Sequence, residues 1–379
     1  MLKIADPLLM REINKFSILE TIRQSGEISR IEITNRTQLS RTTVSAITGA
    51  LLETGLIETS HTEEPSRGRP RVKLALVADA AYAFGIALDA NGLTLSLTNF
   101  RGDVMITARH KRRLADLTAF EIADFITPIL REACAASNID QRRVNGICIG
   151  IPSLTDLENA TCTAEATFAS VTPELRDTLA QRTGLRVFLE NHANLLALDH
   201  QWTGHDGTCA FVVFHETLEL SIIPSNGAHG RLAPAIGHTK IRANGEVCEC
   251  GQVDCAQAYL SLSALTKLNG KAGQSLADLL AAVSPQHASL LADVLGQCVA
   301  HVLNLFAPQK LILTCDSSAF LEHISDELIA SINKNTAKQH LNQTTLEFRA
   351  ANPQNVARGA TAFVLREFYN APWLAKEEK

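Results

Sequence analysis

The sequence lacks any uninterrupted apolar run of the ~18–20 residues that a membrane-spanning helix needs, and it shows no short-period repeat. Charged side chains interrupt residues 1–15, so this stretch does not resemble a secretory signal. We therefore expect a cytoplasmic protein with no membrane contact. Positive charge is not in excess either, because 35 Lys and Arg stand against 40 Asp and Glu, for a net charge of −5. This balance excludes a surface coated in basic charge, yet it permits a local nucleic-acid-binding face.

A disulfide framework is not expected, although the chain has nine cysteines, because thiols stay reduced in the cytoplasm. Six of them are scattered, whereas the other three fall within residues 247–255 (VCECGQVDC). Hydrophobic residues make up 46% and charged residues 20% of the sequence, as in ordinary globular proteins. At 379 residues the chain is too long for one core, which predicts two or three domains.

The first sixty residues show the pattern of a helix-turn-helix. Apolar residues at spacings of three and four predict a helix over 11–25, ended by Gly26. Ser29 suits the cap of a short second helix, and Ser40 suits the cap of a third helix that ends at Gly55. In a helix-turn-helix, this last helix enters the major groove of DNA.

The third helix has an apolar stripe and an opposite polar face. The stripe contains Val44, Ile47, Leu51 and Leu52. The polar face holds hydroxyl side chains and one guanidinium, which suit base edges and phosphates. We therefore expect DNA contacts from Ser40, Arg41, Thr42, Ser45 and Thr48. The solvated face of an ordinary three-helix domain would carry the same pattern, so this alternative stays open.

Two short strands are predicted next, over 57–60 and 72–77, and the loop between them is rich in arginine. Such a strand pair forms a wing, and arginines at its tip suit the narrow minor groove of A·T-rich DNA. The expected contacts are Arg67, Gly68, Arg69 and Arg71. The alternative is a solvated linker between domains. Residues 1–60 hold seven basic and seven acidic side chains, so binding would depend on the wing arginines and on dimerisation.

From about residue 80 the sequence alternates predicted strands and helices, which is typical of an α/β protein. Its motifs come in the order RGRP, IGIPS, ENHAN, IGH, CECGQVDC, LNLFAPQKLIL and ARGA. This series resembles the ROK family (repressors, open reading frames and kinases), and in particular its sugar-responsive repressors, over essentially the whole chain.

The resemblance implies an α/β fold in which an N-terminal winged helix-turn-helix precedes a two-lobed actin/hexokinase-like (ribonuclease H-like) ROK module. We expect the DNA-binding domain at residues 1–77. The first lobe would span 78–190 together with a C-terminal helix at 353–370, and the second lobe, with the cysteine loop, would span 191–352. The resemblance also implies a homodimer or homotetramer on a palindromic operator in double-stranded DNA. The expected role is repression of carbohydrate metabolism or transport genes.

The cysteine loop has the composition of a metal site. Cys248, Cys250 and Cys255 offer three thiolates at a spacing that suits a tetrahedral ion, and Gly251 permits the sharp turn between them. The nearest upstream imidazole is His238, and the resemblance to ROK proteins makes it the fourth ligand. The loop lacks an obvious carboxylate to activate water, so we expect a structural Zn²⁺. The alternative is three buried thiols that bind no metal.

The resemblance also allows each part of a kinase to be checked against this sequence. The catalytic base of the kinases is the Asp of an Asn-Asp pair, which reads Asn191-His192 here. Their first phosphate loop keeps only Asp89, and their second reads HETLELS (215–221), which has no glycine to let a phosphate approach the backbone. We therefore expect a regulator with no catalytic residue. The alternative is an ATP-dependent ROK sugar kinase with a fused DNA-binding domain.

The sugar-binding residues that the resemblance implies are partly replaced. A Glu expected two positions before the Gly-His is Ala235, and a Glu expected two positions after the last cysteine is Gln257. The remaining ligand site would consist of Asn191, His192, His238, Ser153 and Gln257. Either the effector is a different sugar, such as a sugar phosphate or a sugar acid, or the cleft is vestigial and a regulatory protein partner controls the repressor. A further alternative is an interaction module whose winged helix has lost DNA specificity.

Overall fold

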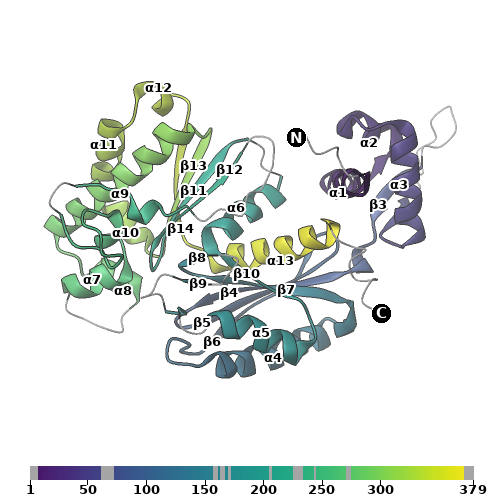
Figure 1. Ribbon diagram of the computed structural model, residues 1–379, viewed down its shortest axis with the longest axis horizontal. Coiled ribbons are helices and arrows are strands. Elements are labelled where there is room, and N and C mark those ends of the chain that lie inside the picture. Colours follow the sequence, from purple (N-terminus) through teal and green to yellow (C-terminus); the bar gives the residue numbers. More distant parts are fainter. Residues whose placement is uncertain are drawn as a thin grey trace.

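The N-terminal part of the chain forms a small helical domain with a three-stranded sheet of order β1-β3-β2, at the right of Figure 1. The computed structural model describes residues 7–60, 72–156, 161–162, 167–169, 172–204, 207–224, 234–242, 245–269 and 275–370. The elements of this domain are α1 (Pro7–Ser25), β1 (Ile28–Ser29), α2 (Arg30–Thr37), α3 (Arg41–Glu53), β2 (Ile57–Ser60) and β3 (Lys73–Leu76). The predicted helix-turn-helix and the two strands of the wing are therefore confirmed.

Local hydrogen bonds determine where these helices begin and end. Ser29 forms a capping box with Glu32, because each side chain bonds the backbone N–H of the other residue. Ser40 accepts a hydrogen bond from the backbone N–H of Thr43 and begins α3. Between α2 and α3, Gln38 adopts a left-handed conformation (φ 58°) that turns the chain. The core of the domain consists of fully buried apolar residues, among them Ile18, Leu19, Ile22, Ile33, Val44, Leu51 and Leu74.

A mixed five-stranded sheet forms the first lobe, with strand order β10-β7-β4-β5-β6. Its strands are β4 (Tyr82–Asp89), β5 (Gly92–Asn99), β6 (Val104–Lys111), β7 (Val144–Ile151) and β10 (Val187–Asn191). β4, β5 and β6 are antiparallel neighbours, whereas β7 and β10 run parallel to β4. Two helices, α4 (Ala119–Ala136) and α5 (Thr172–Thr183), lie below this sheet in Figure 1. A short hairpin, β8 (Leu154–Asp156) and β9 (Thr161–Cys162), follows β7.

A four-stranded sheet of order β12-β11-β13-β14 forms the second lobe. Its strands are β11 (Cys209–Phe214), β12 (Leu218–Ile223), β13 (Lys310–Cys315) and β14 (Thr345–Ala350). The surrounding helices are α7 (Leu262–Asn269), α8 (Leu276–Ala281), α9 (Pro285–Phe306), α10 (Ser318–His323), α11 (Ser325–Asn335) and α12 (Lys338–Leu341). Apolar residues of this sheet and of α9 share one core, which includes Val212, Leu313, Leu295 and Leu303.

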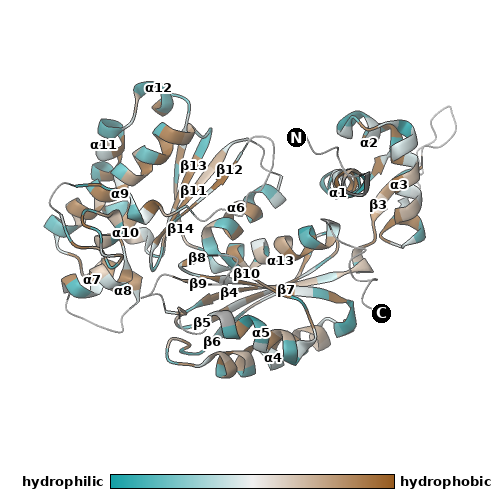
Figure 2. Cartoon of the chain, in the orientation of Figure 1, coloured by the Kyte–Doolittle hydropathy of each residue, from teal (hydrophilic) through white to brown (hydrophobic). Residues whose placement is uncertain are grey.

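Two helices, α6 (His192–Trp202) and α13 (Pro353–Asn370), pack side by side between the two sheets (Figure 1). Both sheets are therefore covered on two faces, and their strands are coloured as largely hydrophobic in Figure 2. The helices touch very closely: a Cβ atom on Gly359 of α13 would lie 2.0 Å from the carbonyl oxygen of Leu195 in α6. Only glycine permits this approach.

One helix among the described residues, α9, is long and apolar enough to cross a membrane by length and composition alone. The sequence analysis found no such run because polar residues such as Asp293 and Gln297 interrupt it. In the structure Val299 and Leu303 of this helix are fully buried in the core of the second lobe. α9 is therefore a central helix of a globular lobe.

The packing of α13 on α6 leads to a stability prediction. Gly359→Ala should lower the free energy of unfolding by about 1–3 kcal/mol, because the new methyl group must push the backbone of α6 away. The matched control is Gly49→Ala in α3, where a Cβ atom meets nothing within 4 Å; there alanine should stabilise the helix by up to about 1 kcal/mol. Denaturant unfolding of both variants checks this, and equal effects would contradict the close packing.

Candidate functional site

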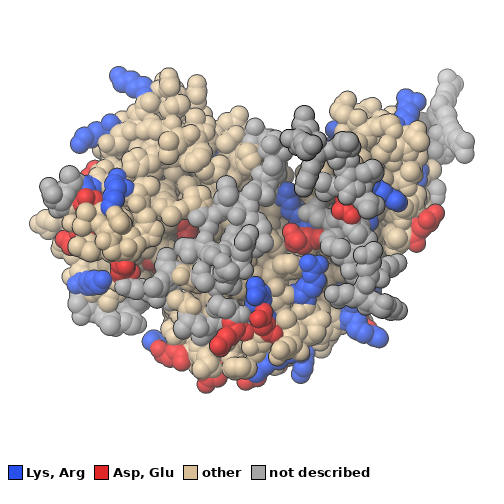
Figure 3. Space-filling model, viewed as in Figure 1, with Lys and Arg blue, Asp and Glu red and all other residues tan. Residues whose placement is uncertain are grey.

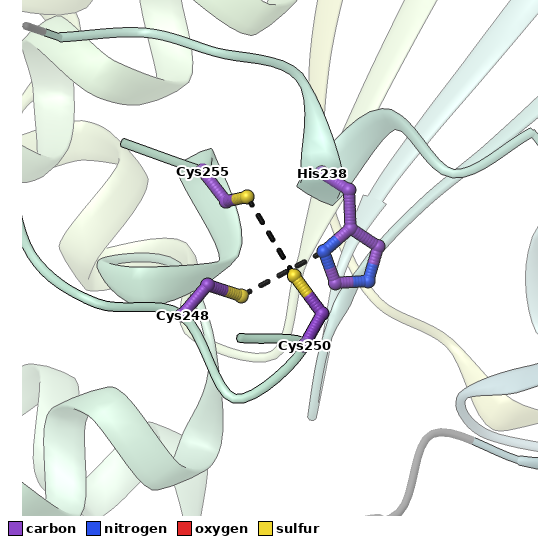
Figure 4. A group of neighbouring side chains, drawn as sticks. All are labelled: His238, Cys248, Cys250 and Cys255. Atoms are coloured by element: carbon purple, nitrogen blue, oxygen red, sulfur yellow. Dashed lines mark hydrogen bonds between the residues drawn. The ribbon is translucent and has the colours of Figure 1, made fainter. Parts of the chain in front are cut away.

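The predicted metal ligands lie together at one corner of the second lobe (Figure 4). The ligand atoms of His238, Cys248, Cys250 and Cys255 all lie within 4.8 Å of one another. The Sγ atoms of Cys250 and Cys255 are 3.8 Å apart, and Cys248 Sγ lies 3.7 Å from His238 Nδ1. A tetrahedral zinc with bonds of about 2.3 Å to sulfur requires S···S distances of about 3.8 Å. The group therefore has the size and the donor atoms of a Cys₃His zinc site.

Backbone geometry holds these four side chains in place. Gly251 has a φ of +82°, and its N–H donates to the Cys248 carbonyl oxygen at 2.9 Å. After the last cysteine, the chain reaches Gln257, which is 6% exposed and packs on Gly237 beside His238. The metal group thus fixes the position of two segments that line the space between the lobes.

Four of the five residues predicted to bind the ligand line one small space between the lobes. Ser153, Asn191, His238 and Gln257 surround a volume of about 40 Å³ together with Glu219. His192 does not join them: it lines a second space of about 40 Å³ on the other side, with Asp89, His215 and Asp316. Each space has room for a few water molecules, whereas sites for organic ligands measure about 300–1,000 Å³. Neither of these two spaces, as the described residues bound them, has room for a sugar.

The two glutamates that the resemblance implies are replaced by Ala235 and Gln257, but a different carboxylate, that of Glu219, lies in this space. Glu219 of β12 is 7% exposed and points into the space beside Asn191 and Ser153. Its Oε1 accepts a hydrogen bond from the Ser153 backbone N–H at 2.7 Å, and its Oε2 accepts one from the Ala193 N–H at 3.1 Å. We call these two contacts the Glu219 bridge. It joins the second sheet to the loop after β7 and to the first turn of α6.

Glu219 was not predicted from the sequence, where HETLELS (215–221) stands out only as a phosphate loop without glycine. In the structure this segment is the turn between β11 and β12 together with the start of β12. Glu216 in the same turn accepts a hydrogen bond from the backbone N–H of Thr167 at 3.0 Å. A signal was available: Glu219 stands between Leu218 and Leu220, so a charged side chain lies within an apolar strand.

The backbone of Ser153, whose N–H group donates to Glu219, has a strained conformation. Ser153 is buried and has a φ of 64°, which is unusual for a residue with a side chain. Its hydroxyl oxygen accepts a hydrogen bond from Thr217 at 3.0 Å. Burial raises the pKa of Glu219 to about 7, although the two backbone N–H groups oppose this shift.

The second space contains two histidines in different electrostatic states. Burial, with His215 nearby, lowers the pKa of His192 to about 3, so its imidazole is neutral, and its Nε2 atom has no hydrogen-bond partner among the described residues. Burial alone would lower the pKa of His215, but Asp316, at 3.0 Å, and further carboxylates raise it above its ordinary value. The position of the kinase base is therefore occupied by a neutral, weakly basic side chain.

α6 connects the cleft to the DNA-binding domain. It begins beside the Glu219 bridge and ends at Trp202, about 16 Å away along an 11-residue helix. Arg23 of α1 stacks on the Trp202 ring, with Cζ 3.8 Å from the ring centroid, and donates to the Trp202 carbonyl oxygen at 3.0 Å. Midway along α6, Asp199 forms a two-pronged ion pair with Arg358 of α13.

The polar face of α3 is exposed only in part. Arg41, Thr42 and Ser45 are exposed, and Ser40 caps the helix from an exposed position. Thr48 is 0% exposed, so its predicted contact with DNA is wrong. Its hydroxyl group donates to the Val44 carbonyl oxygen and accepts a hydrogen bond from Arg30. The predicted wing residues Arg67, Gly68, Arg69 and Arg71 lie outside the described residues.

Charges on the described surface are mixed. On the face seen in Figure 3, blue and red side chains alternate over the first lobe, without a continuous basic area among the residues described there. Several basic side chains near the DNA-binding domain already pair with acids, as Lys73 does with Glu27 and Arg101 with Glu58. Charge on this face therefore does not by itself define a DNA-binding surface.

The fold and these sites define a class of protein: a winged helix-turn-helix joined to a two-lobed module of the sugar-kinase type. The chain belongs to the ROK family, whose model matches residues 85–367. A model of the MarR family matches residues 12–67, which include the helix-turn-helix and β2. The predicted family and fold class are both confirmed.

The similar proteins include DNA-binding transcriptional regulators. The chain is 25% identical to the xylose repressor of Caldicellulosiruptor bescii, over 96% of this chain and 98% of that protein. It is 24% identical to the DNA-binding transcriptional dual regulator NagC of Escherichia coli, over 96% and 94%. Both similarities extend across the DNA-binding domain and the ROK module together.

Solved structures agree on the fold. A ROK family transcriptional regulator, described as a homologue of the Escherichia coli MLC protein, superimposes with a TM-score of 0.74 at 22% identity, over 97% of this chain and 98% of that chain. The ROK hexokinase of Thermus thermophilus has a TM-score of 0.56 at 18% identity and covers 74% of this chain and 97% of its own. The share of this chain that the hexokinase covers is thus about the size of the ROK module without the DNA-binding domain.

Proposed function

We propose that this protein is a transcriptional repressor of genes for carbohydrate metabolism or transport, controlled by a sugar that binds between the lobes. The observation that carries this proposal is the course of α6, which begins in the cleft at His192 and ends against α1 at Trp202. Because α6 is a single helix, a displacement of its first turn also displaces its last turn. The relatives, a xylose repressor and a DNA-binding transcriptional dual regulator that the chain matches over nearly their whole length, support the same function.

In this proposal the sugar controls how the two winged helices of a dimer are spaced. Asn191 caps α6 by accepting a hydrogen bond from the Asn194 N–H at 2.7 Å, and Glu219 holds the next turn. A ligand that parts the lobes must move this end of α6, and Trp202 then shifts against Arg23. Both half-sites of a palindromic operator must be engaged together, so a changed spacing lowers DNA affinity.

We further propose that the protein is not a sugar kinase. A general base works best when its pKa lies near the working pH, and His192, at the position of the base, has a pKa of about 3. The turn that holds ATP phosphates in kinases here carries Glu216 and Glu219. Two buried carboxylates would repel a triphosphate.

The four metal ligands would hold a structural Zn²⁺ in the proposed protein. Zinc would link His238 to the cysteine loop and so fix Gly237 and Gln257 beside the cleft, as the fit of the donor distances supports. No carboxylate belongs to the group, so the ion has a structural role and takes no part in a reaction.

The remaining expectations stay proposals. We propose that the chain divides into three units that move relative to one another. These units are residues 1–77, residues 78–190 with 353–370, and residues 191–352. We propose a homodimer or homotetramer in the cytoplasm, bound to double-stranded DNA. Ser40, Arg41, Thr42 and Ser45 would contact the major groove, and the wing arginines the minor groove.

The wing provides the most direct test of DNA binding. Arg67→Ala combined with Arg69→Ala should weaken binding of the full chain to a selected operator by at least tenfold and reduce its dependence on salt, because arginines release counterions from phosphates. Titration of labelled operator at several salt concentrations measures both quantities. Arg112→Ala with Arg113→Ala, which removes the same charge from the first lobe, is the control. Equal loss in both double variants, or no loss in the first, would refute the wing contacts.

The zinc site is tested by removing its exposed ligand. Cys250→Ser should reduce bound zinc from about one ion per chain to almost none and lower the melting temperature by more than about 5 °C. Elemental analysis and thermal unfolding give the two results. Cys162→Ser, which removes a thiol outside the group, should change neither. Zinc content that stays the same in Cys250→Ser would exclude this assignment.

A further inference from the structure

Buried carboxylates lie in and beside the two spaces between the lobes. Glu219 of β12 is 7% exposed and lines the first space, and Glu216, in the turn before β12, is 6% exposed. Asp89 and Asp316 line the second space. His192 adds a further acceptor, because its ring is neutral and its buried Nε2 atom has no partner in the part of the chain that the structure describes.

The cations described in this region pair with Asp89 and Asp316 and leave Glu216 and Glu219 without an ion pair among the described residues. Among the described residues that line the two spaces there is no Lys or Arg. His215 pairs with Asp316 at 3.0 Å, and Arg109, from β6, pairs with Asp89 at 2.6 Å. Glu216 and Glu219 are left with backbone and hydroxyl donors only among the contacts described for them. The raised pKa of Glu219 is the response expected of a buried carboxylate without a cation.

A metal ion does not suit this region. The described residues contain a single group of His, Cys, Asp and Glu side chains whose donor atoms are close enough for one ion, and that group is the one around His238. The carboxylates of the cleft do not belong to such a group. An organic molecule that carries a positive charge would instead reach Glu219 from the space that Asn191 and Ser153 line.

We propose that the cleft selects an aminated sugar, whose ammonium group binds Glu219, and that it rejects sugar phosphates and sugar acids. This inference rests on the proposed function and names the ligand class of the same site. A carboxylate has about four acceptor positions and an ammonium group three donors. Two of these positions in Glu219 are used by Ser153 and Ala193, which leaves the others for the amine. Asn191 and the Ser153 hydroxyl group remain for sugar hydroxyls.

The same contact explains how such a ligand would act on DNA binding. A sugar cannot enter a space of about 40 Å³ without separating the lobes. Its amine then binds the remaining acceptor positions of Glu219, draws the carboxylate towards the sugar and weakens its hydrogen bonds to Ser153 and Ala193, so the first turn of α6 is released. An acid or a phosphate would bring a second negative charge beside Glu219 and would be repelled.

Calorimetric titration of the full-length, zinc-loaded protein tests the ligand class without any substitution. Glucosamine, galactosamine and mannosamine are each compared with the parent hexose, the N-acetyl derivative and the hexose 6-phosphate. We expect one amine to bind at least tenfold more tightly than its parent and its N-acetyl form, and the phosphate to bind more weakly than the parent. Equal affinities, a tighter phosphate, or no binding by any sugar would overturn the inference.

Two variants locate the charge that is recognised. Glu219→Gln should bring the ratio of amine to parent affinity close to one. Glu190→Gln should keep the wild-type ratio, because Glu190 is equally buried but bonds Asn191 and Asn194 within the protein. A preserved ratio in Glu219→Gln would contradict the role of this residue.

Operator footprinting on the same unliganded samples separates the ligand class from the proposed function. A lost footprint refutes the proposed function, whereas a retained footprint without amine preference refutes only the ligand class.

Discussion

The hydrogen bonds between Glu219 and the backbone N–H groups of Ser153 and Ala193 are the buried polar contact that joins the second sheet to the loop after β7 and to α6. A buried carboxylate loses several kcal/mol of hydration, and short bonds to two backbone donors offset part of that cost. The bridge can form only when the second sheet, the loop after β7 and α6 lie together. In the proposed mechanism, a separation of the lobes, a shift of α6 and a change in the hydrogen bonds of Glu219 therefore occur together.

The DNA-binding domain is tied to this event by packing as well as by polar contacts. Buried residues of α1 share one apolar core with residues of α6 and α13. Trp202 lies in a slot between Arg23, Tyr369 and Gly102, where a Cβ atom on Gly102 would lie 2.5 Å from the indole nitrogen. Such tight packing leaves α6 few ways to move without carrying α1 along.

Much of the fold could be predicted from the sequence, because local signals agreed with it. Ser29 and Ser40 cap their helices, and apolar spacing identified the long helices and most strands. The strands β6, β12 and β14 were missed since polar side chains alternate or intrude in them, as at Glu347. Their identity depends on the neighbouring strands, which supply hydrogen bonds that no local pattern records.

The metal ligands were predictable because cysteine spacing reflects coordination geometry. Thr48 was not, because its burial depends on Arg30 of α2, which covers it. Glu219 was hidden for a similar reason. Its two partners, Ser153 and Ala193, lie 66 and 26 positions away in the chain, so only the folded structure shows that the cleft keeps a carboxylate supplied by a different strand.

The central claim is that the Glu219 bridge and the contact of Arg23 with Trp202 are coupled through α6. A double-mutant cycle on operator affinity, with Glu219→Gln, Arg23→Met and both together, tests it directly. The two sites are separated by the length of α6, and substitutions so far apart normally add within about 0.5 kcal/mol. The account predicts a coupling energy of at least about 1 kcal/mol. Additive effects on operator affinity would contradict it.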